Sequence, residues 1–218
     1  MRESPLNAPF QPVATEPAKL NRRQAAKLRT RQKVLEAARN LFAERGYEPA
    51  TIRDIAKAAG MSTGAVFANF QDKAELFETV LNEEMEAAGE VLRDAAQIKG
   101  PVDQRLIAGL TAGYARDLGH LPLVQAIVAR SWFQPVASEL RARGAIKGLL
   151  VTIGDVLRDG VRKGELSDKA DIRLLSEMIW DAYLSNYRRA AYDGWSADTL
   201  SARIAEQLAV ILAGARTA

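Results

Sequence analysis

The sequence predicts an all-α protein, and two observations carry that prediction. Apolar residues recur at helical spacing along most of the 218-residue chain, as where Leu200, Ile204, Leu208 and Ile211 follow one another at intervals of four, four and three. No segment alternates apolar and polar residues over the length of a convincing strand. Glycine and proline residues separate the helical segments, as expected for turns between helices.

The amino-terminal end is predicted to be a disordered basic tail over residues 1–27. Residues 1–18 contain four prolines and little apolar periodicity. A basic run then follows, consisting of Lys19, Arg22, Arg23, Lys27, Arg29, Arg31 and Lys33. Residues 1–73 hold 13 Lys and Arg against 7 Asp and Glu, whereas the remainder holds 17 against 20. A basic first third on an acidic body is typical of a nucleic-acid-binding domain with an attached partner domain, although a solvated basic face would have the same charge.

A compact helical domain is expected over residues 28–73. Its first packed helix is predicted at about 30–45, where an apolar stripe runs from Val34 to Phe42 and Gly46 ends the helix. Two short helices are predicted at about 51–59 and 62–69. Thr51 and Asp54 have the spacing of a capping box, Gly60 suits a helix end, and Ser62 can cap the second short helix.

The remainder, residues 74–218, is expected to form a connecting helix and a larger second domain. Asp72 and Glu75 cap a long helix over about 73–98, and Gly100-Pro101 is the best boundary signal in the chain. Further helices are expected at about 102–118, 122–130, 135–163, 169–192 and 197–214.

The segment 51–75 is the main functional signal, because it has the form of two short helices joined by a glycine turn. The second of them starts with the short side chains of Thr63, Gly64 and Ala65. A helix that enters the DNA major groove needs a slim, polar start of this kind. The pattern therefore favours DNA binding over catalysis.

Other classes of function find little support in the sequence. With a single histidine, no cysteine and no glycine-rich phosphate loop, we expect no catalytic residues, no metal site and no cofactor. The acidic pair Glu83-Glu84 lies on a helix flank and is interpreted as solvated. No export signal and no apolar run of about 18 residues are present, which favours a cytoplasmic protein.

Residues 31–77 resemble the amino-terminal domain of the TetR family of transcriptional regulators. The matching positions are Ala37-Ala38, Leu41-Phe42, Gly46-Tyr47, Thr51, Ile55-Ala56, Ala59-Gly60-Met61-Ser62, Gly64, Phe70, and Lys73 with Leu76. The resemblance implies a homodimer on double-stranded DNA, in which each subunit has a three-helix helix-turn-helix domain and a larger ligand-binding and dimerisation domain. It also implies a palindromic operator and dimerisation through the last two long helices.

The predicted DNA contacts lie at the start of each motif helix, where the family resemblance supports them, and in the basic run that precedes residues 31–77. The predicted DNA-binding residues are Arg22, Arg23, Lys27, Thr51, Ser62, Thr63, Gly64, Ala65, Phe67, Asn69 and Lys73. Thr51 and Lys73 would meet phosphates at helix N-termini, and Thr63 and Ala65 would meet base edges. Phe67 stands where tyrosine is usual, and Asn69 where histidine or tyrosine is more common, so readout is expected to depend more on DNA shape and on the basic arm.

The second domain is harder to interpret. Tyr114, Trp132, Phe133, Trp180 and Tyr183 are predicted to line an apolar ligand cavity, although ordinary core or interface packing would explain them equally well. His120 is expected at the surface. Leu200, Ile204, Leu208 and Ile211 are predicted at the dimer interface, and the alternative is that they pack on their own domain.

The predicted function is repression from a palindromic operator, relieved by a small hydrophobic or aromatic ligand. The long helix over residues 73–98 would carry the movement between the two sites. One alternative is a helical ligand-binding protein whose DNA binding is vestigial or controlled by a partner. Activation in place of repression is a further alternative.

Overall fold

The computed structural model describes residues 22–131 and 136–217, which form nine α-helices, one 3-10 turn and no named strand. The helices are α1 (Arg22–Arg45), α2 (Ile52–Ala58), α3 (Thr63–Phe67), α4 (Lys73–Ala95), α5 (Val102–Asp117), α6 (Leu121–Ser131), α7 (Val136–Arg162), α8 (Ile172–Asp193) and α9 (Ala197–Ala213), with η1 (Leu118–His120) between α5 and α6. All nine agree with the sequence prediction in type, and all but α1 agree in position to within a few residues. None of the described helices is long and apolar enough to cross a membrane.

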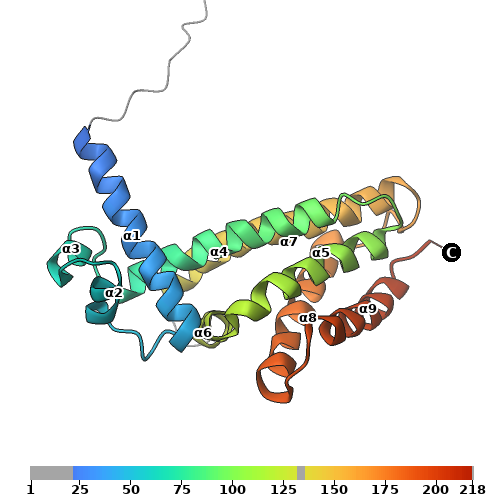
Figure 1. Ribbon diagram of the computed structural model, residues 1–218. Helices are drawn as coiled ribbons and strands as arrows, with labels where there is room; N and C mark the ends of the chain where they lie inside the picture. The colour runs from blue at the N-terminus through green and yellow to red at the C-terminus, as the bar shows by residue number, and fades with distance from the viewer. Residues whose placement is uncertain (1–21, 132–135, 218) are drawn as a thin grey trace, which may run out of the picture.

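Helix α1 differs from its prediction, because it begins at Arg22 and not near residue 30. Residues 22–27, which were predicted to belong to a disordered tail, are helical. The physical reason is that this stretch, RRQAAK, consists of strong helix formers and can extend a helix that the packed residues beyond it have already nucleated. The rest of the predicted tail lies outside the described residues. The amino-terminal part of α1 projects well beyond α2 and α3 (Figure 1).

The first hydrophobic core, here called the amino-terminal core, joins α1, α2, α3 and the start of α4. The Phe42 ring meets Phe77 edge to face with 5.2 Å between centroids, and Tyr47 meets Phe77 at 4.8 Å. The predicted capping box is confirmed, since the Thr51 hydroxyl accepts from the backbone NH of Asp54 and the Asp54 carboxylate accepts from the Thr51 NH. The hydrogen bond from Thr51 lowers the pKa of Asp54.

The first turn of α6 belongs to this same amino-terminal core, although the sequence places it in the second domain. Leu123 is buried there, and Ala126 and Ile127 pack against it. Helix α6 therefore touches the amino-terminal core directly.

A second core, the carboxy-terminal core, is formed by α4, α5, α7, α8 and α9. Helices α4 and α7 run side by side along the long axis of the molecule (Figure 1). Leu200, Ile204 and Leu208 are fully buried in this core within one protomer. Their assignment to the dimer interface is wrong, because the stripe is covered by α5 and α8 of its own chain.

A half-buried ion pair between α5 and α7 stabilises the end of the carboxy-terminal core. Arg105 pairs with Asp159, which also accepts from Lys163 at 2.7 Å and Arg162 at 3.1 Å. Hydrogen bonds from Lys163, and then from Arg105 and Arg162, lower the pKa of Asp159 to about 2.

Asp159→Asn is therefore expected to lower the midpoint of urea unfolding at pH 7. The ionised carboxylate contributes stability above its ordinary pKa of 3.8, and this contribution is lost as the pH falls toward 2. Urea titrations should show a difference in unfolding midpoint between wild type and variant that is constant from pH 7 to 5 and becomes smaller below pH 4. A difference that grew on acidification would contradict the assignment.

Candidate DNA interface and ligand cavity

Helix α3 is short, and its start is exposed. The Ser62 hydroxyl caps it by accepting from the backbone NH of Ala65 at 3.2 Å, so this oxygen serves the helix itself. Thr63 and Gly64 are exposed beside it, while Val66 holds the opposite face in the amino-terminal core. Phe67 is 54 % exposed, so its ring is accessible to a partner at this surface.

Arg31 of α1 contacts the residues that follow α3. Its Nη1 donates to the backbone carbonyl of Asn69 at 2.7 Å, and its guanidinium lies 4.1 Å from the centroid of the Phe70 ring. The Asn69 side chain donates to the carbonyl of Ala65 at 2.9 Å. Asn69 is thus half-buried and engaged in the helix end, which leaves it less free for DNA than its sequence position indicated.

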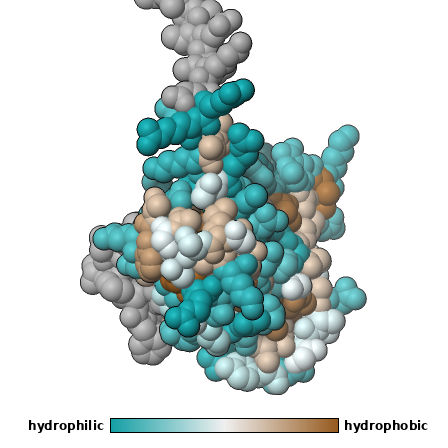
Figure 2. Space-filling model, turned by 60° about the vertical axis from the view of Figure 1, so that its left-hand side comes forward, coloured by the Kyte–Doolittle hydropathy of each residue, from teal (hydrophilic) through white to brown (hydrophobic). Residues whose placement is uncertain are grey.

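The basic end of α1 faces α3 across a groove of about 450 Å³. Arg23 and Lys27 line one side, and Ala65 and Asn69 line the other. Gln24, Thr30 and Ala68 also line it and were missed; Gln24 lies in the helical continuation of α1 that the sequence did not predict, and Thr30 and Ala68 were not singled out. Figure 2, with this end turned forward, shows the end of α1 as a hydrophilic column.

Thr51 and Lys73 stand at the starts of α2 and α4, as predicted for phosphate-binding positions. The Thr51 hydroxyl lies 2.6 Å from the Asp54 carboxylate. The Lys73 ammonium donates to the carbonyl of Glu48 at 3.1 Å and lies 4.1 Å from the centroid of the Tyr47 ring. These contacts hold the ammonium at the start of α4 and do not leave it as a freely solvated charge.

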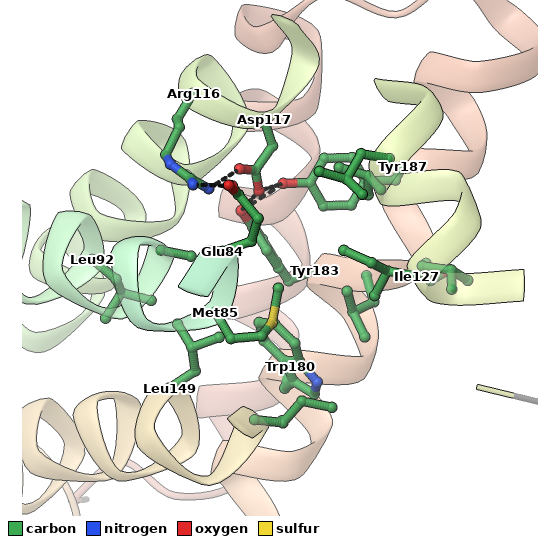
Figure 3. A pocket seen from close by; sticks show the side chains of 18 of the residues that line it. Glu84, Met85, Leu92, Arg116, Asp117, Ile127, Leu149, Trp180, Tyr183 and Tyr187 are labelled. Atoms are coloured by element: carbon green, nitrogen blue, oxygen red, sulfur yellow. Dashed lines mark hydrogen bonds and ion pairs between the residues drawn. The ribbon is translucent and has the colours of Figure 1, made fainter. Parts of the chain in front are cut away.

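A cavity of about 530 Å³ lies between α4, α5, α6, α7 and α8. Most of its wall is apolar, and in Figure 3 Met85, Leu92, Leu149, Trp180 and Ile127 surround it from four helices. The volume falls within the range of roughly 300–1,000 Å³ that is usual for small-molecule sites. The space suits the apolar part of a ligand.

One end of the cavity is polar. Arg116 pairs with Glu84 and, at 2.6 Å, with Asp117. The other Asp117 oxygen accepts from the Tyr187 hydroxyl at 2.6 Å, and the Tyr183 and Tyr187 hydroxyls lie 2.7 Å apart (Figure 3). Burial would lower the pKa of Arg116, but the carboxylates of Asp117 and Glu84 raise it. Burial raises the pKa of both tyrosines, so their hydroxyls stay protonated.

The predicted ligand-binding residues fall into three groups. Trp180 and Tyr183 line the cavity. Tyr114 does not, which corrects its prediction: it is fully buried behind Tyr183, stacked on that ring at 4.5 Å between centroids. Trp132 and Phe133 lie outside the described residues.

The residues missed by the sequence analysis are mostly at the polar end. Glu84 was interpreted as solvated, yet its side chain is only 13 % exposed and contacts two arginines. Tyr187, Arg116 and Asp117 were not singled out. The only sequence signal of Arg116 and Asp117 is a basic-acidic pair at the end of a helix, which is common on protein surfaces. His120 is exposed, as expected, and also lies at the edge of the cavity.

Comparison with known proteins identifies the family. Residues 34–80 match the bacterial regulatory proteins of the tetR family. The HTH-type transcriptional repressor BepR of Brucella suis is 30 % identical over 170 residues, which cover 73 % of this chain and 79 % of that protein.

The chain belongs to the TetR family.

Other similar proteins extend the match over most of the chain. The fatty acid metabolism regulator protein of Bacillus subtilis is 26 % identical over 149 residues, 67 % of this chain and 76 % of that protein. The crystal structure of the regulator FadR from Bacillus subtilis in complex with stearoyl-CoA has the same fold, with a TM-score of 0.72 and 21 % identity over 81 % of this chain and 96 % of that one.

TetR membership confirms the predicted class of function. These relatives are DNA-binding transcriptional regulators and not enzymes, so the chain is a regulator built from a helix-turn-helix and a helical second part. The matched residues 34–80 include α2 and α3 and the start of α4, where most of the predicted DNA contacts lie. Arg22, Arg23 and Lys27 lie outside this match.

Phe67→Ala tests the departure from the usual TetR pattern. Because the ring is more than half exposed, we expect the thermal unfolding midpoint to stay close to that of wild type. Operator affinity is expected to fall about tenfold, the order of one lost contact in a specific DNA interface. Phe67→Tyr is the matched control and should retain or strengthen binding, since it keeps the ring and adds a phosphate-binding hydroxyl. Equal affinities in a fluorescence anisotropy titration of all three proteins would remove Phe67 from the interface.

Proposed function

We propose that this TetR-family regulator represses transcription by occupying a palindromic operator and leaves it when a largely apolar ligand enters the cavity. The observation that carries the proposal is the position of α6. Leu123 and Ile127 line the cavity and also pack in or against the amino-terminal core that supports α3. A ligand that favours a different placement of α6 would therefore act on the same side chains that hold the DNA-binding helices.

Helix α4 provides a second connection. It begins in the amino-terminal core with Leu76 and Phe77, and farther along it lines the cavity with Met85, Ala88 and Leu92. The segment 73–98 was predicted to carry the movement between the two sites, and over Lys73–Ala95 it is one continuous helix. Ligand binding would shift the population toward a conformer whose recognition helices no longer fit successive major grooves.

A palindromic operator needs a two-fold dimer, and the outer faces of α8 and α9 support one. Leu174, Met178 and Tyr192 of α8 are exposed, and so is Val210 of α9. Several large exposed apolar side chains on two neighbouring helices would favour an interface if they gather in one patch. We place the dimer contact on these residues and not on the buried stripe of α9, and of the predicted set only the half-buried Ile211 remains a candidate. Acting on chromosomal DNA, such a dimer would work in the cytoplasm.

The ligand we propose is an elongated amphiphile of the fatty acyl type. The long apolar wall would take the chain, and Arg116 and the paired tyrosines would face the polar head. Two of the comparisons support this class: a relative from Bacillus subtilis is named a fatty acid metabolism regulator protein, and the similar structure of FadR from Bacillus subtilis holds stearoyl-CoA.

The test uses a fragment of the DNA that flanks the gene and carries an inverted repeat. The purified protein should shift this fragment with an affinity that falls steeply as salt rises, and stearoyl-CoA should release it. Stearoyl-CoA binding with unchanged operator affinity would favour the alternative of a ligand-binding protein whose DNA binding is vestigial. Transcription in vitro from the same fragment separates repression, which we expect, from activation.

A further inference from the structure

A chain of charged residues connects α1 to the polar end of the cavity through one carboxylate. Arg39 of α1 contacts Glu84 of α4, with Nε 2.8 Å from Oε1, and its Nη2 pairs with Glu83. The second oxygen of Glu84 pairs with Arg116 of α5, whose Nη1 lies 2.6 Å from Asp117. Glu84 therefore bridges one arginine from the amino-terminal core region and one from the cavity wall.

Because the carboxylates of this bridge are largely buried, their energy depends strongly on which cations contact them. The side chains of Glu84 and Asp117 are 13 % and 14 % exposed, so solvent and salt screen their interactions only weakly. A partly buried carboxylate that loses one of two cations has to move or find another donor, because an uncompensated charge is costly there. The structure shows the bridge with both arginines engaged, and withdrawal of Arg116 would leave Glu84 with Arg39 as its cation.

One end of this charged network lies at the cavity, and the other lies on the helix that positions the DNA-binding surface. Glu84, Arg116 and Asp117 line the cavity (Figure 3). Arg39 follows the buried residues Ala37 and Ala38 on α1, the helix that carries the basic groove wall and, through Arg31, the end of α3. The contact of Glu84 with Arg39 is therefore one of two ion pairs, beside that of Glu83 with Arg39, that join α4 to the helix that positions the DNA-binding surface.

We propose that Glu84 couples the cavity to operator binding, with Arg39 and Arg116 as its positioning partners. The arrangement in this structure, with both arginines engaged, is the one that favours DNA. A ligand head group that accepts hydrogen bonds competes for Arg116 and repels Glu84, which weakens the tie between α4 and α1. This mechanism rests on the proposed function for its ligand, but the tie itself acts without one.

The first experiment needs no ligand. Operator dissociation constants are measured for wild type, Arg39→Gln, Arg116→Gln and the double variant. Each single substitution is expected to weaken binding by 5- to 50-fold, within the usual range of coupling between sites. The double variant is expected to lose less affinity than the product of the two single losses, because both changes remove a cation from Glu84. Fully multiplicative effects, or single variants that bind like wild type, would overturn the proposal.

Two readouts separate coupling from other roles. Arg39→Gln should leave the salt dependence of operator binding unchanged, whereas loss of a direct phosphate contact would reduce the slope of log K against log salt by about 0.9. Arg105→Gln is the matched control, since Arg105 joins α5 to α7 in an ion pair of similar exposure and does not line the cavity. It should lower the unfolding midpoint and leave operator affinity unchanged. A salt slope that dropped in Arg39→Gln, or an affinity loss in Arg105→Gln equal to that of Arg116→Gln, would also overturn the proposal.

A ligand arm tests the proposed function separately. At stearoyl-CoA concentrations that saturate each protein in a calorimetric titration, the ligand should weaken operator binding by Glu84→Gln less than threefold. If wild type itself fails to bind stearoyl-CoA, the acyl ligand class is wrong, while the ligand-free cycle still decides the role of Glu84. Should Arg116→Gln fail to fold, Glu84→Gln replaces it in a cycle with Arg39→Gln, with the same expectation of non-additivity.

Discussion

Replacing Arg22, Arg23 and Lys27 together by glutamine is expected to cause the largest loss of operator affinity. All three are exposed on the projecting end of α1, and Arg23 and Lys27 line the groove that faces α3. Each phosphate contact that is lost should weaken binding on the order of tenfold near 0.1 M salt and make the salt slope shallower by about 0.9. Glutamine is a good helix former, so α1 should persist. Anisotropy titrations between 0.05 and 0.3 M salt measure both quantities.

The control for charge is a triple neutralisation elsewhere. Arg93, Lys99 and Lys169 are exposed on or near the carboxy-terminal core, and their change to glutamine alters the net charge equally. This control should change operator affinity only slightly. Equal effects of the two triple variants would show that total charge, and not the α1 arm, governs binding.

Ala88→Phe is expected to give a repressor that the ligand no longer releases. Ala88 of α4 is buried at the cavity wall, and the added ring would occupy space that a ligand needs. We expect ligand affinity to fall at least tenfold and operator affinity in the absence of ligand to stay near that of wild type. The unfolding midpoint should change modestly, because the ring enters a hollow and not a filled core. Stearoyl-CoA titrations of the protein–DNA complex measure the release.

Ala87→Phe is the matched control on the same helix. Ala87 is half-buried and does not line the cavity, so release by ligand should persist. If Ala88→Phe were released as readily as Ala87→Phe, the ligand would have to bind elsewhere.

Much of the helical plan follows from local signals. The capping residues Thr51, Ser62 and Asp72 form the hydrogen bonds that their spacing predicted. Gly46 and Gly60 adopt the positive φ expected beyond a helix end. These interactions involve residues within a few positions of each other, and for that reason they can be identified without the tertiary structure.

The start of α1 and the lining of the cavity are harder to predict from the sequence. Residues 22–27 carry little apolar periodicity, so a prediction based on buried stripes begins the helix too late, although their intrinsic helix propensity is high. The polar end of the cavity brings together residues from α4, α5 and α8. No spacing along the chain encodes that Arg116 meets Glu84, 32 positions away.

The sequence alone determined that this protein is helical, where its helices are capped, and that its amino-terminal part binds DNA. Only the tertiary structure decided that Leu200, Ile204 and Leu208 belong to the protomer core and that Glu84 is enclosed by two arginines. The physical reason is that helical periodicity shows which residues share a face. Whether that face meets the same chain, a second copy, a ligand or water depends on how the helices pack.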